Sequence, residues 1–287
     1  MDRRTELRDF LQSHRAKLQP EDVGLPAFGG RRRVPGLRRE ELAQLAGISV
    51  DYYVRFEQGR NPHASQAVLD SVARALRLDE TEQLHLQNLA RPVKARGASA
   101  PRPQRVPAGL RQLLNALSDA PAYVLGRRGD ILAWNALAAA LLGDFGRLAP
   151  EERNLARLVF LDETARCLYA DWEFKAKGTV GLLRFDAGRH PDDPRLTELI
   201  GELSLKSADF RRLWAAQAVE QKTRGRMSFH HQVTGPLHLD FETLRLPDDQ
   251  DQLLVTYTAK PGSHDITALR LLASWGSEPA PDHTRSR

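Results

Sequence analysis

The sequence of 287 residues contains a single cysteine, Cys167. One cysteine cannot form an intramolecular disulfide, and it excludes a zinc site built from several thiolates. We expect Cys167 to be a small buried side chain on a helix rather than a redox sensor.

Long apolar runs are also missing, since no stretch approaches the ~18 residues of a membrane span. The charged beginning MDRRTELRDF does not resemble a secretory signal. The expectation is a cytoplasmic protein with no membrane partner.

Common catalytic and metal-binding patterns are missing as well. There is no GxSxG, no HExxH and no glycine-rich phosphate loop. The acidic pairs 151–152 and 192–193 fall in turns or helix starts, where they complement the helix dipole. His230, His231 and His238 lie on predicted strands, but neighbouring strand residues face opposite sides and do not easily share a metal. We therefore expect no enzyme activity, no metal and no cofactor.

Positive charge is concentrated in the first third of the chain. The formal net charge is +5, yet residues 1–105 hold 19 Lys and Arg against 13 Asp and Glu. The remainder is nearly neutral. Such a distribution is expected if the N-terminal part contacts phosphates and the rest does not.

The segment 39–59, REELAQLAGISVDYYVRFEQG, predicts a helix, a tight turn and a second helix. Leu42 lies on the inner face of the first helix, and Gly47 ends that helix where a left-handed backbone suits glycine. Ser49 is a good N-cap for the next helix, and Tyr53 and Phe56 supply its buried face. This is a helix-turn-helix, whose second helix can enter a DNA major groove.

ELAQLAGIS followed by a helix ending in EQGR resembles the DNA-binding domain of the Xre/Cro-type regulators, and SVDYYVRFEQGR resembles their MmyB-like branch. The resemblance implies that Arg39 holds the DNA backbone, while Val50, Asp51 and Arg55 face bases. The arginine triplet 31–33 follows two glycines, and it is either a phosphate or minor-groove contact or a solvated loop. The predicted DNA-binding residues are Arg31, Arg32, Arg33, Arg39, Ser49, Val50, Asp51, Tyr52, Arg55, Arg60 and Asn61.

The chain is expected to hold two domains. Residues 1–92 read as a five-helix domain, and the Pro- and Arg-rich segment 93–107 reads as a linker. Residues 108–276 begin with a hairpin, AYVLGRRGDILAWN, whose turn is placed at Gly129–Asp130. A mostly helical region, three further strands and a closing helix follow, and residues 277–287 are expected to be a disordered tail.

The second half also resembles a known family. GDILAWNALAAALLGDF, YADWEF, the segment HPDDPRLTELIGELSLKSADFRRLWA and LVTYTAKPGS occur in the order found in the ligand-binding domain of MmyB-like regulators. This resemblance implies a PAS-like α/β sensor with a five-stranded antiparallel sheet and helices over one side. Some members hold a long-chain fatty acid. The expected fold is therefore multidomain, α followed by α+β, with a fatty-acid-like molecule as a possible ligand.

Several large aromatic residues could line a pocket for an apolar ligand, although residues of this kind are more often plain core. A carboxylate in such a pocket would need a cation, and two arginines one helical turn apart are candidates. The predicted ligand-binding residues are Trp134, Arg153, Arg157, Tyr169, Trp172 and Trp214.

Three functions remain open from the sequence. The first is a ligand-responsive, sequence-specific transcription regulator that binds double-stranded DNA as a homodimer and senses a small apolar molecule. The second is an enzyme or ligand carrier with an appended DNA-binding module. The third is an interaction module similar to an antitoxin, for which the second domain is larger than needed.

Overall fold

The computed structural model forms two compact units. The residues it describes are 3–25, 36–60, 64–90, 104–216 and 223–275. Unit 1 comprises residues 1–98 together with 180–221, and unit 2 comprises 99–179 together with 222–287. Unit 1 thus contains the predicted helical domain and also a helical segment from the predicted second domain. No helix within the described ranges is long and apolar enough to cross a bilayer.

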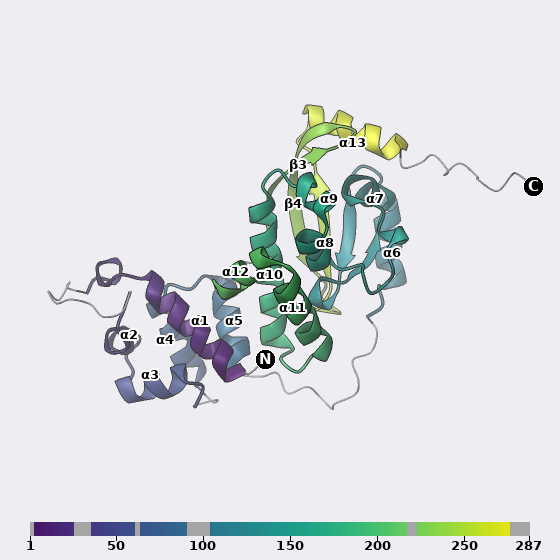
Figure 1. Cartoon of the computed structure of the whole chain (residues 1–287). Coiled ribbons are helices and arrows are strands. Elements are labelled where there is room, and N and C mark those ends of the chain that lie inside the picture. The colour runs from purple at the N-terminus through teal and green to yellow at the C-terminus, as the bar shows by residue number, and fades with distance from the viewer. Residues whose placement is uncertain (1–2, 26–35, 61–63, 91–103, 217–222, 276–287) are drawn as a thin grey trace, which may run out of the picture. The chain divides into compact units, whose positions relative to one another are not determined.

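The N-terminal part of unit 1 is a set of short helices around one apolar core (Figure 1). Phe10, Leu42, Tyr53 and Phe56 are fully buried in this core, in agreement with their predicted inward positions. The elements are α1 (Arg3–Lys17), the 3-10 helix η1 (Pro20–Val23), α2 (Arg39–Ala46), α3 (Val50–Glu57), α4 (Gln66–Ala75) and α5 (Glu80–Ala90).

Unit 1 also includes the second half of α10 (Trp172–Arg189), α11 (Pro194–Lys206) and α12 (Ala208–Ala215). Arg184 of α10 is buried, with its guanidinium carbon 4.3 Å from the ring centroid of Trp214. Burial lowers the pKa of Arg184 to about 10, and the carboxylate of Glu6 opposes this effect. Gly188 faces His85 so closely that an added Cβ would lie 2.9 Å from its Nδ1. Helix α10 therefore contributes to both units.

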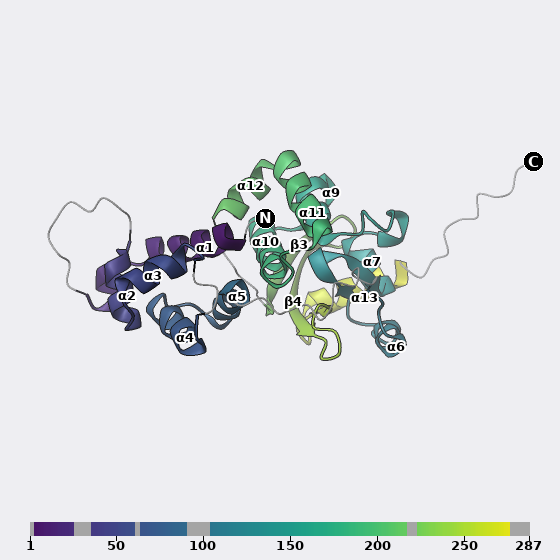
Figure 2. The same cartoon turned by 90° about the horizontal axis from the view of Figure 1, so that it is seen from below.

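Unit 2 is built on an antiparallel sheet with the strand order β2-β1-β5-β4-β3. Figure 2 labels β3 and β4, which are neighbours in this sheet. The strands are β1 (Ala122–Leu125), β2 (Ile131–Trp134), β3 (Arg224–His231), β4 (Gly235–Arg245) and β5 (Leu253–Thr258). The helices are α6 (Ala108–Ala116), α7 (Ala136–Leu142), α8 (Leu155–Leu161), α9 (Glu163–Leu168), the start of α10, α13 (His264–Trp275), and the 3-10 helices η2 (Arg127–Gly129) and η3 (Phe145–Arg147). The described residues thus confirm the predicted five-stranded antiparallel sheet.

The two faces of this sheet differ in character. Tyr123, Phe229 and Tyr257 lie on one face, where the Tyr257 ring is 6.3 Å from that of Tyr123 and 5.5 Å from that of Phe229. Val124 and Leu254, on alternate positions, face the other side and form a small core with α6. This alternation follows from the two-residue period of a strand. The aromatic face is the one on which a cavity can form.

One local prediction for unit 2 needs correction. The hairpin turn between β1 and β2 is the 3-10 turn η2, with Arg128 at φ 62°, instead of a two-residue Gly129–Asp130 turn. The region after residue 154 is mostly helical, as predicted, and consists of α8, α9 and α10. Asp162 ends α8 and begins α9, because its carboxylate accepts the backbone N–H of Thr164 at 2.8 Å. A side chain that binds nearby backbone in this way competes with helix continuation.

Candidate DNA-binding surface and ligand cavity

The turn between α2 and α3 has the geometry that the sequence predicts. Gly47 has φ 67° and ψ 31°, and Ile48 N–H donates to Ala43 C=O at 3.0 Å. The Ser49 hydroxyl accepts the N–H of Tyr52 at 3.2 Å, so Ser49 caps α3. A glycine in the left-handed region and a serine N-cap together fix the direction of α3. The predicted roles of Gly47 and Ser49 in the turn are confirmed.

The outer face of α3 is accessible. The side chains of Asp51 and Arg55 are 79% and 57% exposed and form an ion pair at 2.7 Å. Val50 is also exposed, and Tyr52 is half-buried against the core. An exposed ion pair one helical turn apart contributes little to stability, so Arg55 can leave Asp51 at small cost. Val50, Asp51 and Arg55, which the sequence assigns to base contact, are therefore exposed in the part of the chain that the structure describes.

The buried carboxylate of Glu57 holds the end of α3 in place. Glu57 is fully buried and accepts from Arg39 Nε at 2.8 Å and from Arg15 Nη2 at 3.3 Å. The hydrogen bond to Glu57 raises the pKa of Arg39 above its ordinary value. The Arg39 side chain remains 40% exposed, so it can contact solvent or a ligand while Glu57 holds it in place. Sequence reasoning missed Glu57, although an acid within the inner face of α3 was a visible signal.

Arginines from distant segments meet beside this anchor. A surface hollow of about 380 Å³ is lined by Arg4, Thr5, Arg8, Arg39, Gln58 and Arg60, and we refer to it as the arginine hollow. Arg39 and Arg60 were predicted to contact DNA, whereas Arg4 and Arg8 were not. The predicted residues Arg31, Arg32, Arg33 and Asn61 lie outside the described residues.

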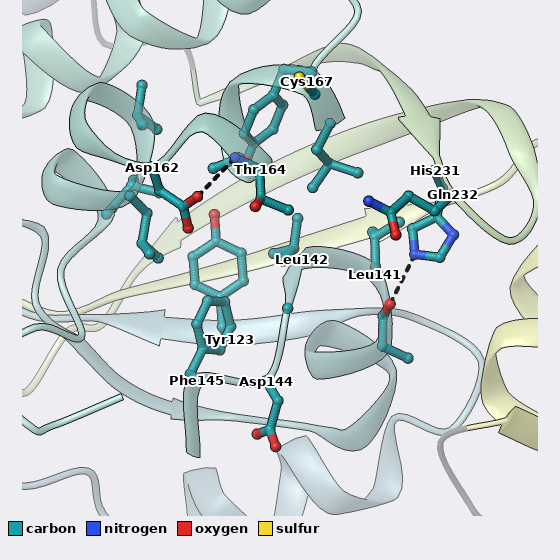
Figure 3. Close-up of a pocket in the computed structure, with 18 of the residues that line it drawn as sticks. Tyr123, Leu141, Leu142, Asp144, Phe145, Asp162, Thr164, Cys167, His231 and Gln232 are labelled. Atoms are coloured by element: carbon teal, nitrogen blue, oxygen red, sulfur yellow. Dashed lines mark hydrogen bonds between the residues drawn. The ribbon is translucent and has the colours of Figure 1, made fainter. Parts of the chain in front are cut away.

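Unit 2 contains a cavity of about 730 Å³ on the aromatic face of the sheet, which we call the ligand cavity (Figure 3). This volume lies in the range of roughly 300–1,000 Å³ that is typical of small-molecule sites. Its wall is mainly apolar and comes from β1, β2, α7, α8, α9 and the β3–β4 hairpin. The apolar lining residues include Tyr123, Ile131, Ala140, Leu141, Leu142, Phe145, Leu148, Leu155, Leu158, Val159, Leu168, Tyr169, Val233 and Leu272.

Polar groups lie on two sides of the cavity wall. Figure 3 shows the Tyr123 hydroxyl directed toward Asp162 and Thr164, while Gln232 and His231 lie across the cavity from them. Burial raises the pKa of both Tyr123 and Tyr169 well above the ordinary value, so both hydroxyls stay protonated. The wall can therefore enclose an apolar body and form hydrogen bonds with one polar end.

Comparison with known families gives a match for each part of the chain. The family model for the MmyB-like transcription regulator ligand binding domain matches residues 106–272, and a helix-turn-helix domain model matches residues 6–86. The first match alone covers more than half of the chain. The chain belongs to the MmyB-like helix-turn-helix transcription regulators. No curated protein matches this regulator.

The residues that line the ligand cavity of this MmyB-like regulator overlap with the expected ones at one position. All six predicted ligand-binding residues lie within the described ranges; Tyr169 lines the cavity, and the other five are not among its lining residues. Arg153 lies over Trp134, 5.4 Å from the ring centroid, and both line a separate hollow with Arg111. The segment before α8 runs beside the start of β2, where Ile131 N–H donates to Arg153 C=O at 2.7 Å.

The other three predicted ligand-binding residues, Arg157, Trp172 and Trp214, have partners outside the ligand cavity. Trp172 donates its Nε1–H to Val159 C=O at 2.9 Å and packs on Phe160, and Arg157 donates to Glu151 C=O. Trp214 belongs to unit 1, where it covers Arg184. Cys167, expected to be buried, is exposed on α9 and lines the cavity.

The three histidines of β3 and β4, His230, His231 and His238, do not converge. His231 Nε2 lies 3.1 Å from Ala140 C=O, and its Nδ1 accepts the N–H of Val233 at 3.2 Å. His238 Nδ1 lies 2.9 Å from the Ser228 hydroxyl. Within the described ranges, no three His, Cys, Asp or Glu side chains come together as a metal site would need.

Proposed function

We propose that this regulator binds a specific DNA sequence through α3 and that the ligand cavity controls this binding. One observation carries the proposal: Arg55 and the N-terminal turn of α3 are exposed on a helix whose cap and buried Glu57 anchor fix its position. A rigidly held, outward-facing helix is what major-groove contact requires. Because one recognition helix covers only a few base pairs, the protein binds a near-palindromic site as a homodimer.

The ligand in this proposal is a small, largely apolar molecule, and a long-chain fatty acid is the class that the family resemblance suggests. The apolar wall of the ligand cavity supports an aliphatic or aromatic body, and the polar group around Tyr123 supports one polar end. A ligand changes DNA affinity only if it binds two arrangements of the protein unequally. Helix α10 is a candidate for the link, because Trp172 at its start is bonded to Val159 of the cavity wall and its second half belongs to unit 1.

Selection of bound duplexes from a random pool, with and without a lipid extract, tests the proposal. We expect the wild-type protein to enrich one near-palindromic sequence and the extract to change its affinity. Arg55→Ala should lose about 1–3 kcal/mol of binding free energy and relax one base position. Arg39→Ala should weaken binding to all sequences alike. If Arg55→Ala retained both affinity and preference, α3 would not be the reading helix.

Native mass spectrometry of the protein purified from its host distinguishes the enzyme alternative. An unmodified apolar molecule bound to the protein supports sensing. Accumulation of a converted product would support an enzyme or carrier with an attached DNA-binding module.

A further inference from the structure

The arginine hollow combines four cations from three separate parts of the chain. Arg4 and Arg8 come from α1, Arg39 from the first position of α2, and Arg60 from the turn after α3. The other two lining residues, Thr5 and Gln58, are uncharged hydrogen-bonding residues. Among the described residues, the lining contains no acid. Clustered arginines that can approach one anion are a characteristic way to bind phosphate.

The protein core holds these arginines together. Glu57 bonds to both Arg15 of α1 and Arg39 of α2, which fixes the two helices against the end of α3. Gly59 has φ +66°, and a Cβ added there would lie 2.9 Å from Cβ of Arg4. Glycine at this position thus permits the close approach of α1 to the turn that carries Arg60. The hollow is a consequence of packing and does not depend on a chance arrangement of surface side chains.

Two acids beside the hollow form ion pairs with its arginines. Asp9 pairs with Arg8 Nε at 3.1 Å, and Glu57 is shared by Arg15 and Arg39. Glu40 also raises the pKa of Arg39, whereas the lining itself holds four arginines and, among the described residues, no acid. The first turn of α1 adds the positive end of a helix dipole on the same side.

From this arrangement we propose that Arg4 and Arg8, with Arg39 and Arg60, bind the phosphodiester backbone of duplex DNA. The proposal rests on the proposed function and extends the DNA contact to α1. The hollow adjoins the C-terminal end of α3 through Gln58, its C-cap, so it lies next to the helix that faces bases. Duplex DNA, unlike a free phosphate ion, gains binding free energy from released counterions, which suits an open site with exposed arginines.

The double variant Arg4→Ala/Arg8→Ala tests the site through salt dependence. Each lost phosphate contact lowers the slope of log affinity against log salt by roughly 0.9, so the double variant should lose about 1.8. The sequence enriched from a random pool should not change, since phosphate contacts carry no base information. Arg4→Lys/Arg8→Lys keeps both charges and should keep most of the slope.

Arg111→Ala/Arg270→Ala is the matched control, because it removes the same net charge from exposed positions of unit 2. It should leave the salt slope within about 0.3 of wild type, well inside the change of roughly 0.9 expected for one phosphate contact. A wild-type slope in Arg4→Ala/Arg8→Ala would overturn the proposal. A second result would also overturn it in favour of a free-anion site. In that case the wild-type protein binds inorganic phosphate saturably, and Arg4→Ala/Arg8→Ala abolishes this binding but leaves the DNA salt slope unchanged.

The proposal and the regulator function can fail separately. If the wild-type protein enriches one sequence but the alanine variant keeps its slope, only the assignment of Arg4 and Arg8 falls. If the wild-type protein enriches no sequence, the sequence-specific function falls. The slope on a duplex of arbitrary sequence then still shows whether the hollow binds the DNA backbone.

Discussion

The surface of α3 and the ligand cavity are built in opposite ways. The α3 surface comes from neighbours in sequence, since Val50, Asp51 and Arg55 stand within two turns of one helix. The cavity is lined by residues from Tyr123 to Leu272, which meet only after the sheet has formed. One site is charged and exposed, and the other is mainly apolar and partly open to solvent. A short-range site can be located from a motif, whereas a long-range site depends on which residues the fold brings together.

The largest expected effect tests whether the DNA-binding surface depends on its buried anchor. Glu57→Gln removes the carboxylate from Arg15 and Arg39, and loss of one partner of a buried ion pair costs about 3–5 kcal/mol. Urea unfolding of the full chain should show this loss in the transition of unit 1, while binding of an apolar probe by unit 2 persists. Glu40→Gln, an exposed acid on α2, should change the unfolding free energy by less than ~0.5 kcal/mol. Equal stability of both variants would show that Glu57 is not an anchor.

A second prediction concerns pH and is specific to unit 1. Burial lowers the pKa of His85 from its ordinary 6.5 to about 3, with smaller effects from Arg184 and His14. His85 of the unfolded chain therefore becomes protonated below pH 6.5, whereas His85 of the folded chain becomes protonated only near pH 3. Stability falls as pH decreases through this window, by roughly 3 kcal/mol at pH 4. Glu6 acts in the opposite sense, because burial raises the pKa of its carboxyl.

The measurement is the change in unfolding free energy between pH 7 and pH 4. His85→Gln should lose roughly 3 kcal/mol less than wild type over this interval, since glutamine does not titrate. His264→Gln at the exposed start of α13 should behave as wild type. An identical acid-induced loss in His85→Gln and wild type would contradict the expected low pKa of His85.

The smallest effect is expected at the ligand cavity. Leu158 is half-buried in the cavity wall, so Leu158→Trp should occupy ligand space without displacing the core. We expect affinity for the fluorescent fatty acid cis-parinaric acid to fall at least tenfold, which is about 1.4 kcal/mol. Leu271→Trp on the exposed side of α13 is the control. Undiminished probe binding by Leu158→Trp would place the apolar ligand elsewhere, and DNA affinity without ligand should be the same in both variants.

Prediction from sequence was accurate where local chemistry decides. Gly47 ends α2 and Ser49 caps α3, as their residue types indicate. A cap needs only one side chain and a backbone N–H two or three residues away. The number of strands followed from alternation and turn residues, which are also short-range signals.

Prediction was less accurate where several segments meet. Large aromatics such as Trp134 and Trp172 looked suited to a ligand, but each is engaged by a partner of its own, Arg153 over one ring and Val159 C=O at the other. Small and aliphatic residues of α7 and α8 contribute to the cavity wall instead. Nothing in their spacing distinguishes a cavity wall from a filled core, because both are apolar at the same period.

The sequence by itself determined the helix-turn-helix and the exposed position of Arg55, since these depend on residues close together in the chain. Tertiary structure alone decided that Glu57 joins Arg15 and Arg39, that Arg4 and Arg8 share a hollow with Arg60, and that Tyr169 but not Trp214 lines the ligand cavity. These side-chain contacts depend on the packing of elements far apart in sequence. The periodicity of one helix or strand carries no information about which distant element it packs against.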